Sequence, residues 1–230
     1  MRIFAHINWL YSTLVVFTGL TLKILLFPLL PRPYASKVAS WFIRTLIFVY
    51  VRKIGDADPD AQLFIINHQS ELDIGVIESS TAKDLAWVAK KELFEVPFFS
   101  LSLRLSGEIP LERESKSALV ALLKASKERI DSGRVICIFP EGTRSESGKM
   151  RSFKPGAKLI ADTLGLTVQP IVLIDTARHY STKRMRAAPG VITAVFLESF
   201  KADKSDKTWL VRLHDTMQRT YDRYAHKAGA

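Results

Sequence analysis

The chain has little of what several large enzyme classes need. Its single cysteine, Cys137, can form neither an intramolecular disulfide nor a cysteine-based zinc cluster, and it fits a reducing compartment. The sequence also contains no Gly-x-Ser-x-Gly elbow, no Walker loop, no dinucleotide-binding glycine fingerprint and no His-Glu-x-x-His pair. These absences argue against a serine hydrolase, an NTPase, a Rossmann dehydrogenase and a zinc protease, and they leave no obvious covalent nucleophile.

The composition describes a basic, folded protein. Its 230 residues are 47% hydrophobic and 24% charged, which excludes disorder and allows one large α/β domain with an appendage. Lys and Arg number 33 against 23 Asp and Glu, so the net charge is +10. Such a charge suits nucleic acid, an anionic membrane or an anionic substrate. The aromatic residues cluster in apolar N-terminal stretches rather than among basic residues, which favours membrane and phosphate.

The N-terminal run 7–30 is predominantly apolar, and Lys23 is the one charged residue in it. A helix needs roughly 20 apolar residues to cross a bilayer, so this run is long enough to span one. It is too long for an ordinary signal-peptide core, and Pro31-Arg32-Pro33 follows it in place of a small-residue cleavage site. Packing against a soluble core is the other interpretation. Whether the segment spans or re-enters the membrane is left open.

A second helix is expected over residues 34–53. Its cations Lys37, Arg44 and Arg52 are seven and eight residues apart, so a helix would place them on one face, with apolar residues covering the rest. This pattern is typical of a helix lying among lipid headgroups. We therefore predict a membrane-associating element at residues 1–55 and a second domain at residues 56–230, separated by a polar turn at 55–60.

The second domain alternates apolar strand candidates with helix candidates, which predicts an α/β fold with a mixed sheet flanked by helices. The expected strands are 63–66, 85–88, 108–111, 135–139, 167–173 and 191–197. The expected helices are 73–79, 98–105, 115–132, 155–164 and an amphipathic terminal helix from residue 209.

The run Asn-His-Gln-Ser-Glu-Leu-Asp, at 67–73, follows an apolar strand candidate. Histidine has a pKa near neutrality and can remove the proton of a hydroxyl group. A carboxylate on the far ring nitrogen would hold its tautomer and stabilise the imidazolium. His68 and Asp73 are therefore a candidate base and its orienter. The alternative is a surface histidine beside a helix-capping aspartate.

Two later runs add candidate anion-binding residues. The run 107–113 reads Gly-Glu-Ile-Pro-Leu-Glu-Arg, and its Arg113 could hold a phosphate through a forked guanidinium. A solvated arginine beside acidic neighbours is the alternative.

The run 139–145 reads Phe-Pro-Glu-Gly-Thr-Arg-Ser after another apolar strand candidate. Glu141 could bind substrate hydroxyls or anchor the loop, and Gly142 permits close approach of a ligand. Arg144 adds a cation, as does Lys154 before a helix, where anions are favoured.

These three runs and Val-Gln-Pro-Ile at 168–171 resemble, in this order, the glycerolipid acyltransferase superfamily, and most closely its bacterial 1-acyl-sn-glycerol-3-phosphate acyltransferase branch. The resemblance implies a mixed α/β acyltransferase fold preceded by a two-helix membrane-docking element. It implies His68 as base, Asp73 as its orienter and Arg113 as the phosphate ligand. It further implies an acceptor site shaped by Glu141, Gly142, Thr143 and Arg144, with Lys154 a looser candidate, and it requires no metal or cofactor.

The second run departs from the common pattern of this superfamily. Pro110 and Glu112 stand where a bulky apolar residue and an aspartate are frequent. This departure spares Arg113 but leaves the identity of the acceptor open.

The implied reaction joins lysophosphatidic acid and an acyl thioester, acyl-CoA or acyl carrier protein, to give phosphatidic acid. The implied location is a membrane, on the cytoplasmic face of the inner membrane. Another acceptor, such as glycerol 3-phosphate or another lysophospholipid, is the first alternative, and a non-catalytic lipid-binding protein is the second. The basic loop 179–186 could hold the phosphates of the donor, face the membrane or simply be solvated.

Overall fold

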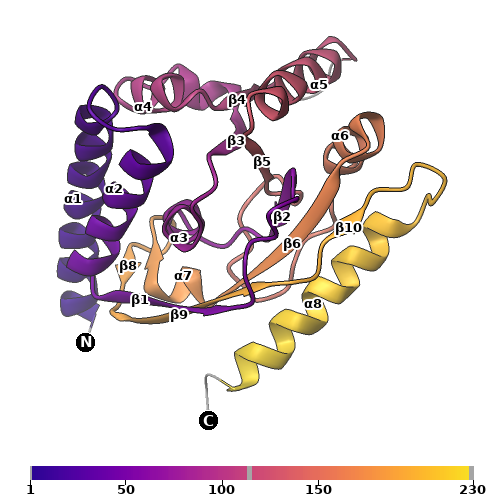
Figure 1. The fold of residues 1–230 in the computed structure, drawn as a ribbon. Coiled ribbons are helices and arrows are strands. Elements are labelled where there is room, and N and C mark those ends of the chain that lie inside the picture. Colours follow the sequence, from indigo (N-terminus) through magenta and orange to yellow (C-terminus); the bar gives the residue numbers. More distant parts are fainter. Residues whose placement is uncertain (1, 113–115, 228–230) are drawn as a thin grey trace.

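A mixed sheet forms the centre of the protein (Figure 1). The computed structural model describes residues 2–112 and 116–227. The sheet has the order β1-β9-β6-β2-β5-β3-β4, with β10 paired to β6. Its strands are β1 (Val49–Ile54), β2 (Leu63–Ile66), β3 (Leu85–Lys90), β4 (Ile109–Leu111), β5 (Val135–Ile138), β6 (Thr167–Ile174), β9 (Gly190–Phe196) and β10 (Phe200–Lys201). A separate hairpin pairs β7 (Tyr180–Ser181) with β8 (Arg186–Ala187).

Strand direction brings the ends of several strands together. Strand β2 runs parallel to β5 and β6, and β3 runs parallel to β4 and β5, whereas β9 and β10 are antiparallel to β6. The carboxyl ends of parallel strands meet at one edge, which is where α/β proteins usually bind ligands. The segments that follow β2 and β5 are therefore neighbours.

Helices cover both faces of the sheet. They are α1 (Arg2–Leu26), α2 (Arg32–Leu46), α3 (Leu72–Ser80), α4 (Phe99–Ser106), α5 (Lys116–Asp131), α6 (Gly156–Leu164), α7 (Thr176–His179) and α8 (Trp209–Lys227), with a 3-10 turn, η1 (Lys91–Phe94). Alternate residues of β2 serve two cores, because successive side chains of a strand point to opposite faces. Phe64 and Ile66 pack with residues of α1 and α3, whereas Leu63 and Ile65 pack with residues of α5, α6 and α8.

The predicted mixed α/β sheet is confirmed, and each expected strand and helix of the second domain is present within a few residues. In the N-terminal element, the helix expected at 34–53 differs from the structure, because α2 ends at Leu46 rather than at residue 53. Residues 49–54 instead form β1, whose partner β9 is far away in sequence. Arg52 therefore lies on a strand, where its Nε donates to Thr193 Oγ1 over 3.2 Å, and it does not share a helix face with Lys37 and Arg44. The proposed domain boundary at residue 55 stays a prediction.

Helix α1 is long and apolar enough to cross a membrane by length and composition. One side of it packs against α2 and α4, and α2 in turn packs against α3. Lys23 of α1 forms a buried ion pair with Glu78 of α3, with Nζ 2.7 Å from Oε1, and Ser40 Oγ donates to the other oxygen over 2.8 Å. This pair fixes α1 to the helix that carries Asp73.

Candidate active site

His68 and Asp73 form a hydrogen-bonded pair at the carboxyl end of β2. Nδ1 of His68 lies 2.7 Å from Oδ2 of Asp73, which sits in the first turn of α3 and is fully buried. The same oxygen accepts the backbone N–H groups of Gln69 at 2.6 Å and Ser70 at 2.9 Å. The chain between strand and helix thus folds around one carboxylate oxygen. This contact confirms that the two residues meet, as their spacing predicts.

The carboxylate sets the tautomer of the histidine. With Nδ1 as donor to Asp73, Nε2 is the ring atom that can accept a proton. The His68 side chain keeps 19% of its surface exposed, so this atom belongs to a ring that a substrate can reach. The ring stacks on Phe139, with centroids 3.9 Å apart and planes 12° apart, and Phe139 stacks on Trp87 at 5.1 Å. The imidazole is therefore held at one nitrogen and on one face.

Glu141 ties the loop after β5 to the histidine. Its Oε1 accepts the backbone N–H of His68 at 2.9 Å, and its Oε2 accepts that of Arg151 at 2.7 Å. Burial raises the pKa of this carboxyl above its ordinary value, although the two backbone donors oppose the shift. Both oxygens serve backbone donors, so these contacts are those of a loop anchor. The predicted contact with substrate stays a prediction.

The rest of the loop surrounds this anchor. Gly142 has a φ of 68°, which a side chain would strain, and its N–H donates to Phe139 O over 3.0 Å. Thr143 is exposed. The guanidinium of Arg144 forms an ion pair with Glu71 and lies 3.4 Å from Thr182 Oγ1, so it is engaged on the rim of the site.

The two remaining candidates stand apart from this cluster. The backbone N–H of Lys154 donates to Pro140 O over 2.8 Å, which holds the segment before α6 near the loop, but its side chain is exposed. Arg113 lies outside the described residues. The roles of these residues in binding substrate stay predictions.

Known proteins share this arrangement of strands and loops. Residues 49–174, which contain His68, Asp73 and the loop of Glu141, match the family model described as Acyltransferase. The chain belongs to the acyltransferase family. A 1-acyl-sn-glycerol-3-phosphate acyltransferase of Helicobacter pylori is 39% identical over 98% of this chain and 97% of its own length. One from Pseudomonas aeruginosa is 31% identical over 73% of this chain and 65% of its own length.

A solved structure supports the fold of this acyltransferase. The crystal structure of the 1-acyl-sn-glycerophosphate (LPA) acyltransferase of Thermotoga maritima superposes with a TM-score of 0.78 over 97% of both chains, at 24% identity. The mixed sheet and its flanking helices are therefore those of a known acyltransferase fold.

Sequence reasoning missed several residues that support the histidine of this acyltransferase. The ring of Phe139, which directly follows β5, stacks on the ring of Trp87 in β3, although the two residues lie 52 positions apart in the chain. The N–H of Ser145 donates to His68 O over 2.8 Å. Phe139 and Ser145 lie within the run 139–145, so their presence was visible, but their contacts depend on the parallel pairing of β2 and β5.

Proposed function

We propose that this acyltransferase moves a fatty acyl group from an acyl thioester to the sn-2 hydroxyl of lysophosphatidic acid and so makes phosphatidic acid. The His68–Asp73 pair carries the proposal, since it supplies a base of defined tautomer at the carboxyl edge of the sheet. The names of the relatives support this choice of acceptor.

In the proposed reaction, Nε2 of His68 takes the proton of the sn-2 hydroxyl as its oxygen attacks the thioester carbonyl carbon. The C–S bond then breaks, and the thiolate of coenzyme A or of acyl carrier protein leaves. The imidazolium returns the proton to that thiolate. Asp73 stabilises the imidazolium through the 2.7 Å hydrogen bond and keeps Nε2 directed outward. The bound alcohol is the nucleophile, so the proposal needs no covalent enzyme intermediate, metal or cofactor.

Separate residues would hold the acceptor phosphate. Arg113 is assigned this role from its place at the end of the run 107–113. Arg144 could contribute only by exchanging Glu71 or Thr182 for a phosphate oxygen, because both now contact its guanidinium. Glu141 would act indirectly, by holding the loop that carries Gly142, Thr143 and Arg144. Lys154, whose exposed side chain precedes α6, stays a looser candidate.

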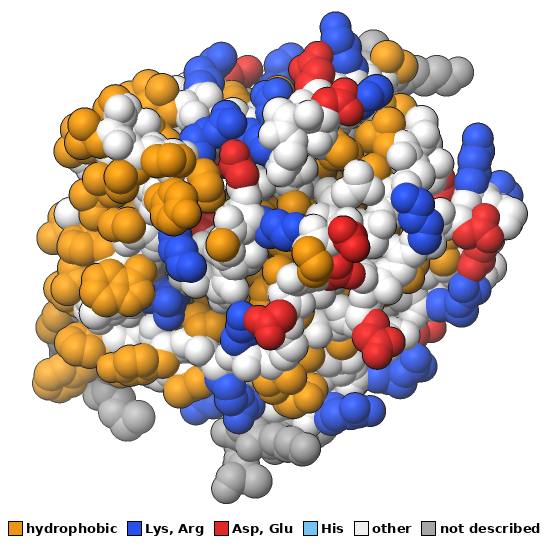
Figure 2. Space-filling model, viewed as in Figure 1, with side chains coloured by type: hydrophobic (Ala, Val, Ile, Leu, Met, Phe, Trp, Pro, Cys, Tyr) orange, Lys and Arg blue, Asp and Glu red, His pale blue; other side chains and the backbone are white. Residues whose placement is uncertain are grey.

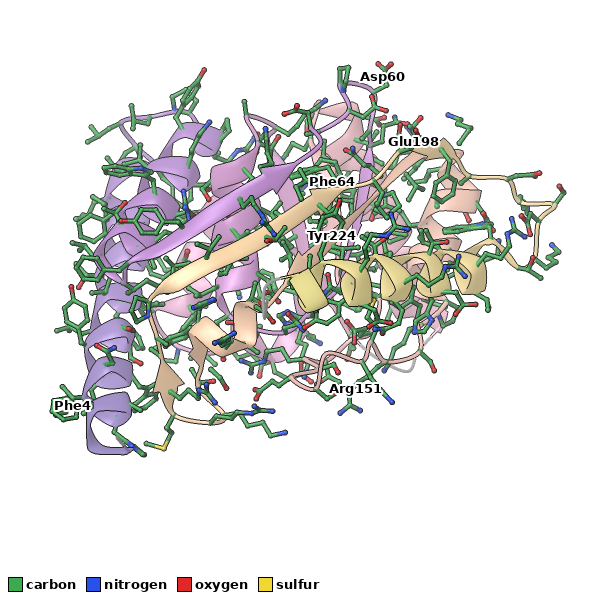
Figure 3. All side chains as sticks on the ribbon, turned by 90° about the horizontal axis from the view of Figure 1, so that it is seen from below. Phe4, Asp60, Phe64, Arg151, Glu198 and Tyr224 are labelled. Atoms are coloured by element: carbon green, nitrogen blue, oxygen red, sulfur yellow. The ribbon has the colours of Figure 1, made fainter. Side chains whose placement is uncertain are left out.

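We further propose that α1 and α2 dock the enzyme on the cytoplasmic face of the membrane, where acyl thioester donors occur. Figure 2 shows apolar side chains gathered over the side of the molecule that these helices form. Phe4, 78% exposed, projects from α1 away from the rest of the chain (Figure 3). Leu10, Leu14, Leu25 and Trp41 are also exposed. An apolar helix face of this kind binds the boundary between headgroups and acyl chains.

An acceptor comparison tests the proposal. Purified enzyme in mixed micelles receives one labelled donor, either acyl-CoA or acylated acyl carrier protein. The acceptor is lysophosphatidic acid, glycerol 3-phosphate or lysophosphatidylcholine. We expect the highest kcat/KM with lysophosphatidic acid. A higher value with another acceptor would reassign the substrate, and no transfer to any acceptor from either donor would contradict acyltransfer itself.

A further inference from the structure

A cavity of about 170 Å³ lies beside the candidate active site. A single water needs only roughly 15 Å³ of such space, so the cavity can hold a group of several heavy atoms. Its walls come from the segments after β2 and β5, from α7, from the β7–β8 hairpin and from α8. The lining residues are Gln69, Glu146, Asp175, Ala177, Arg178, Arg184, Arg186 and Tyr221.

The cavity shares two chain segments with the catalytic histidine. Gln69 follows His68 directly, and its side chain bonds to Tyr221 OH at 3.1 Å and to Thr176 Oγ1 at 3.4 Å. Glu146 follows Ser145, whose N–H donates to His68 O. The His68 ring itself stacks on Phe139. Two successive residues, His68 and Gln69, thus line two different sites that are fixed relative to each other.

The charges in the cavity favour an anion. The lining contains three arginines, Arg178, Arg184 and Arg186, and two acidic residues, Glu146 and Asp175. Glu146 is already committed, since its carboxylate bonds to Arg184 at 2.6 Å and accepts from Ser181 Oγ at 2.9 Å. Among the described residues, Arg178 and Arg186 have no ion pair or side-chain hydrogen bond, and both are exposed. Two forked guanidinium groups are therefore available, with one carboxylate, Asp175, beside them.

We propose that this cavity binds a phosphate group of an acyl-CoA donor. Arg guanidinium groups match phosphate oxygens in charge and in geometry. In acyl-CoA, the nucleotide phosphates lie at the opposite end of the pantetheine arm from the thioester carbon. A donor whose carbonyl reaches His68 therefore needs an anion site outside the histidine pocket but rigidly connected to it. The inference rests on the proposed acyltransfer, because it assigns the donor of that reaction.

A double substitution, Arg178→Gln with Arg186→Gln, removes the two available guanidinium groups. Losing charged hydrogen bonds to phosphate should raise the KM for acyl-CoA about tenfold, with the KM for lysophosphatidic acid and kcat nearly unchanged. The control, Lys124→Gln with Lys201→Gln, removes the same charge at exposed positions on α5 and β10 and should leave all three parameters unchanged.

A truncated donor isolates the phosphate. Acyl-pantetheine carries the thioester but no nucleotide phosphates, so wild type and the arginine variant should use it with equal KM. An equal loss of affinity for both donors, or an unchanged KM for acyl-CoA, would overturn the proposal. A third outcome would also overturn it: an unchanged KM for acyl-CoA in the arginine variant, together with a loss of binding to anionic but not to zwitterionic vesicles relative to wild type. That result would assign the arginines to lipid headgroups.

Calorimetry with free coenzyme A separates this inference from the proposed function. Binding needs no acceptor, so it can be measured even if lysophosphatidic acid is not the substrate. We expect wild type and the lysine control to bind coenzyme A, and the arginine variant to bind about tenfold more weakly. Equal affinity in wild type and the arginine variant, or no binding by wild type, would contradict a phosphate site in this cavity.

Discussion

One oxygen of Asp73 holds His68 and the turn that carries it. Oδ2 accepts the imidazole Nδ1–H at 2.7 Å and the backbone N–H groups of Gln69 and Ser70 at 2.6 and 2.9 Å. The carboxylate is fully buried, so its contacts with these donors are shielded from water. The position and the tautomer of the His68 imidazole therefore depend on the same carboxylate oxygen.

Asp73→Asn should separate charge from geometry. The amide oxygen can replace Oδ2 as acceptor, but the negative charge that stabilises the imidazolium is lost. We expect kcat to fall by about 10²–10⁴-fold with little loss of folded protein. Initial rates and thermal melts measure the two effects. Asp131→Asn, which alters an exposed pair with Lys127, should change neither. Near-normal kcat in Asp73→Asn would contradict the role of the carboxylate.

Glu141→Gln should disturb the loop beneath the histidine. An amide has one acceptor oxygen where the carboxylate has two, so the N–H of either His68 or Arg151 would face an NH₂ group. A buried donor without a partner costs about 1–3 kcal/mol. We expect a lower melting temperature and a lower kcat than in the exposed control Glu198→Gln. Unchanged values for both would show that the loop does not depend on this anchor.

Glu108 should make stability depend on pH. Burial raises the pKa of this carboxyl from 4.5 to about 7, while Lys23, Arg134 and the Trp87 N–H pull it back. The folded state thus binds its proton more tightly than the unfolded state, and stability is lost as pH rises from about 4.5 to 7. The loss from this one group is on the order of 3 kcal/mol.

Glu108→Gln removes that titration and keeps an oxygen that can accept the backbone N–H of Trp87. In the wild type, this backbone nitrogen lies 2.5 Å from Oε2 of Glu108. Melting temperatures at pH 5 and pH 8 measure the effect. The melting temperature of the variant should exceed that of wild type only slightly at pH 5, and by several degrees at pH 8. The same gain at both pH values would mean that Glu108 does not titrate in this window.

The apolar face of α1 should govern membrane binding. Leu10→Gln with Leu14→Gln removes two exposed apolar side chains and should reduce binding to phospholipid vesicles several-fold, without lowering the melting temperature. Val211→Gln with Leu119→Gln, which alters exposed residues of α8 and α5, is the matched control. Equal vesicle binding in both double variants would contradict docking through α1.

Local pattern predicted most of the fold. The apolar runs that became β2, β5 and β6 are short, contain many β-branched residues and are followed by polar residues. His68 and Asp73 are close enough in sequence to meet in one turn. The boundary of α2 could not be predicted in this way. Val49-Tyr50-Val51 continues an apolar stretch, and only its pairing with β9, some 140 residues later, makes it a strand.

Long-range contacts explain the other gaps in the predicted site. Arg144 looked like a free cation, but Glu71 lies beside it because the turn before α3 meets the loop after β5. The arginines of the cavity come from α7 and the β7–β8 hairpin, whereas Gln69 comes from the other end of the domain sequence. No spacing rule connects residues this far apart, since their proximity depends on strand order.

Phosphatidic acid formation by wild type and His68→Ala is the most direct test of the account. Melting temperatures would first show that both proteins are equally well folded. Each protein would then receive lysophosphatidic acid and labelled long-chain acyl-CoA in the same micelles. We expect labelled phosphatidic acid from wild type and at least about 10³-fold less from His68→Ala. Near-normal product from His68→Ala would contradict the central claim that His68 is the base.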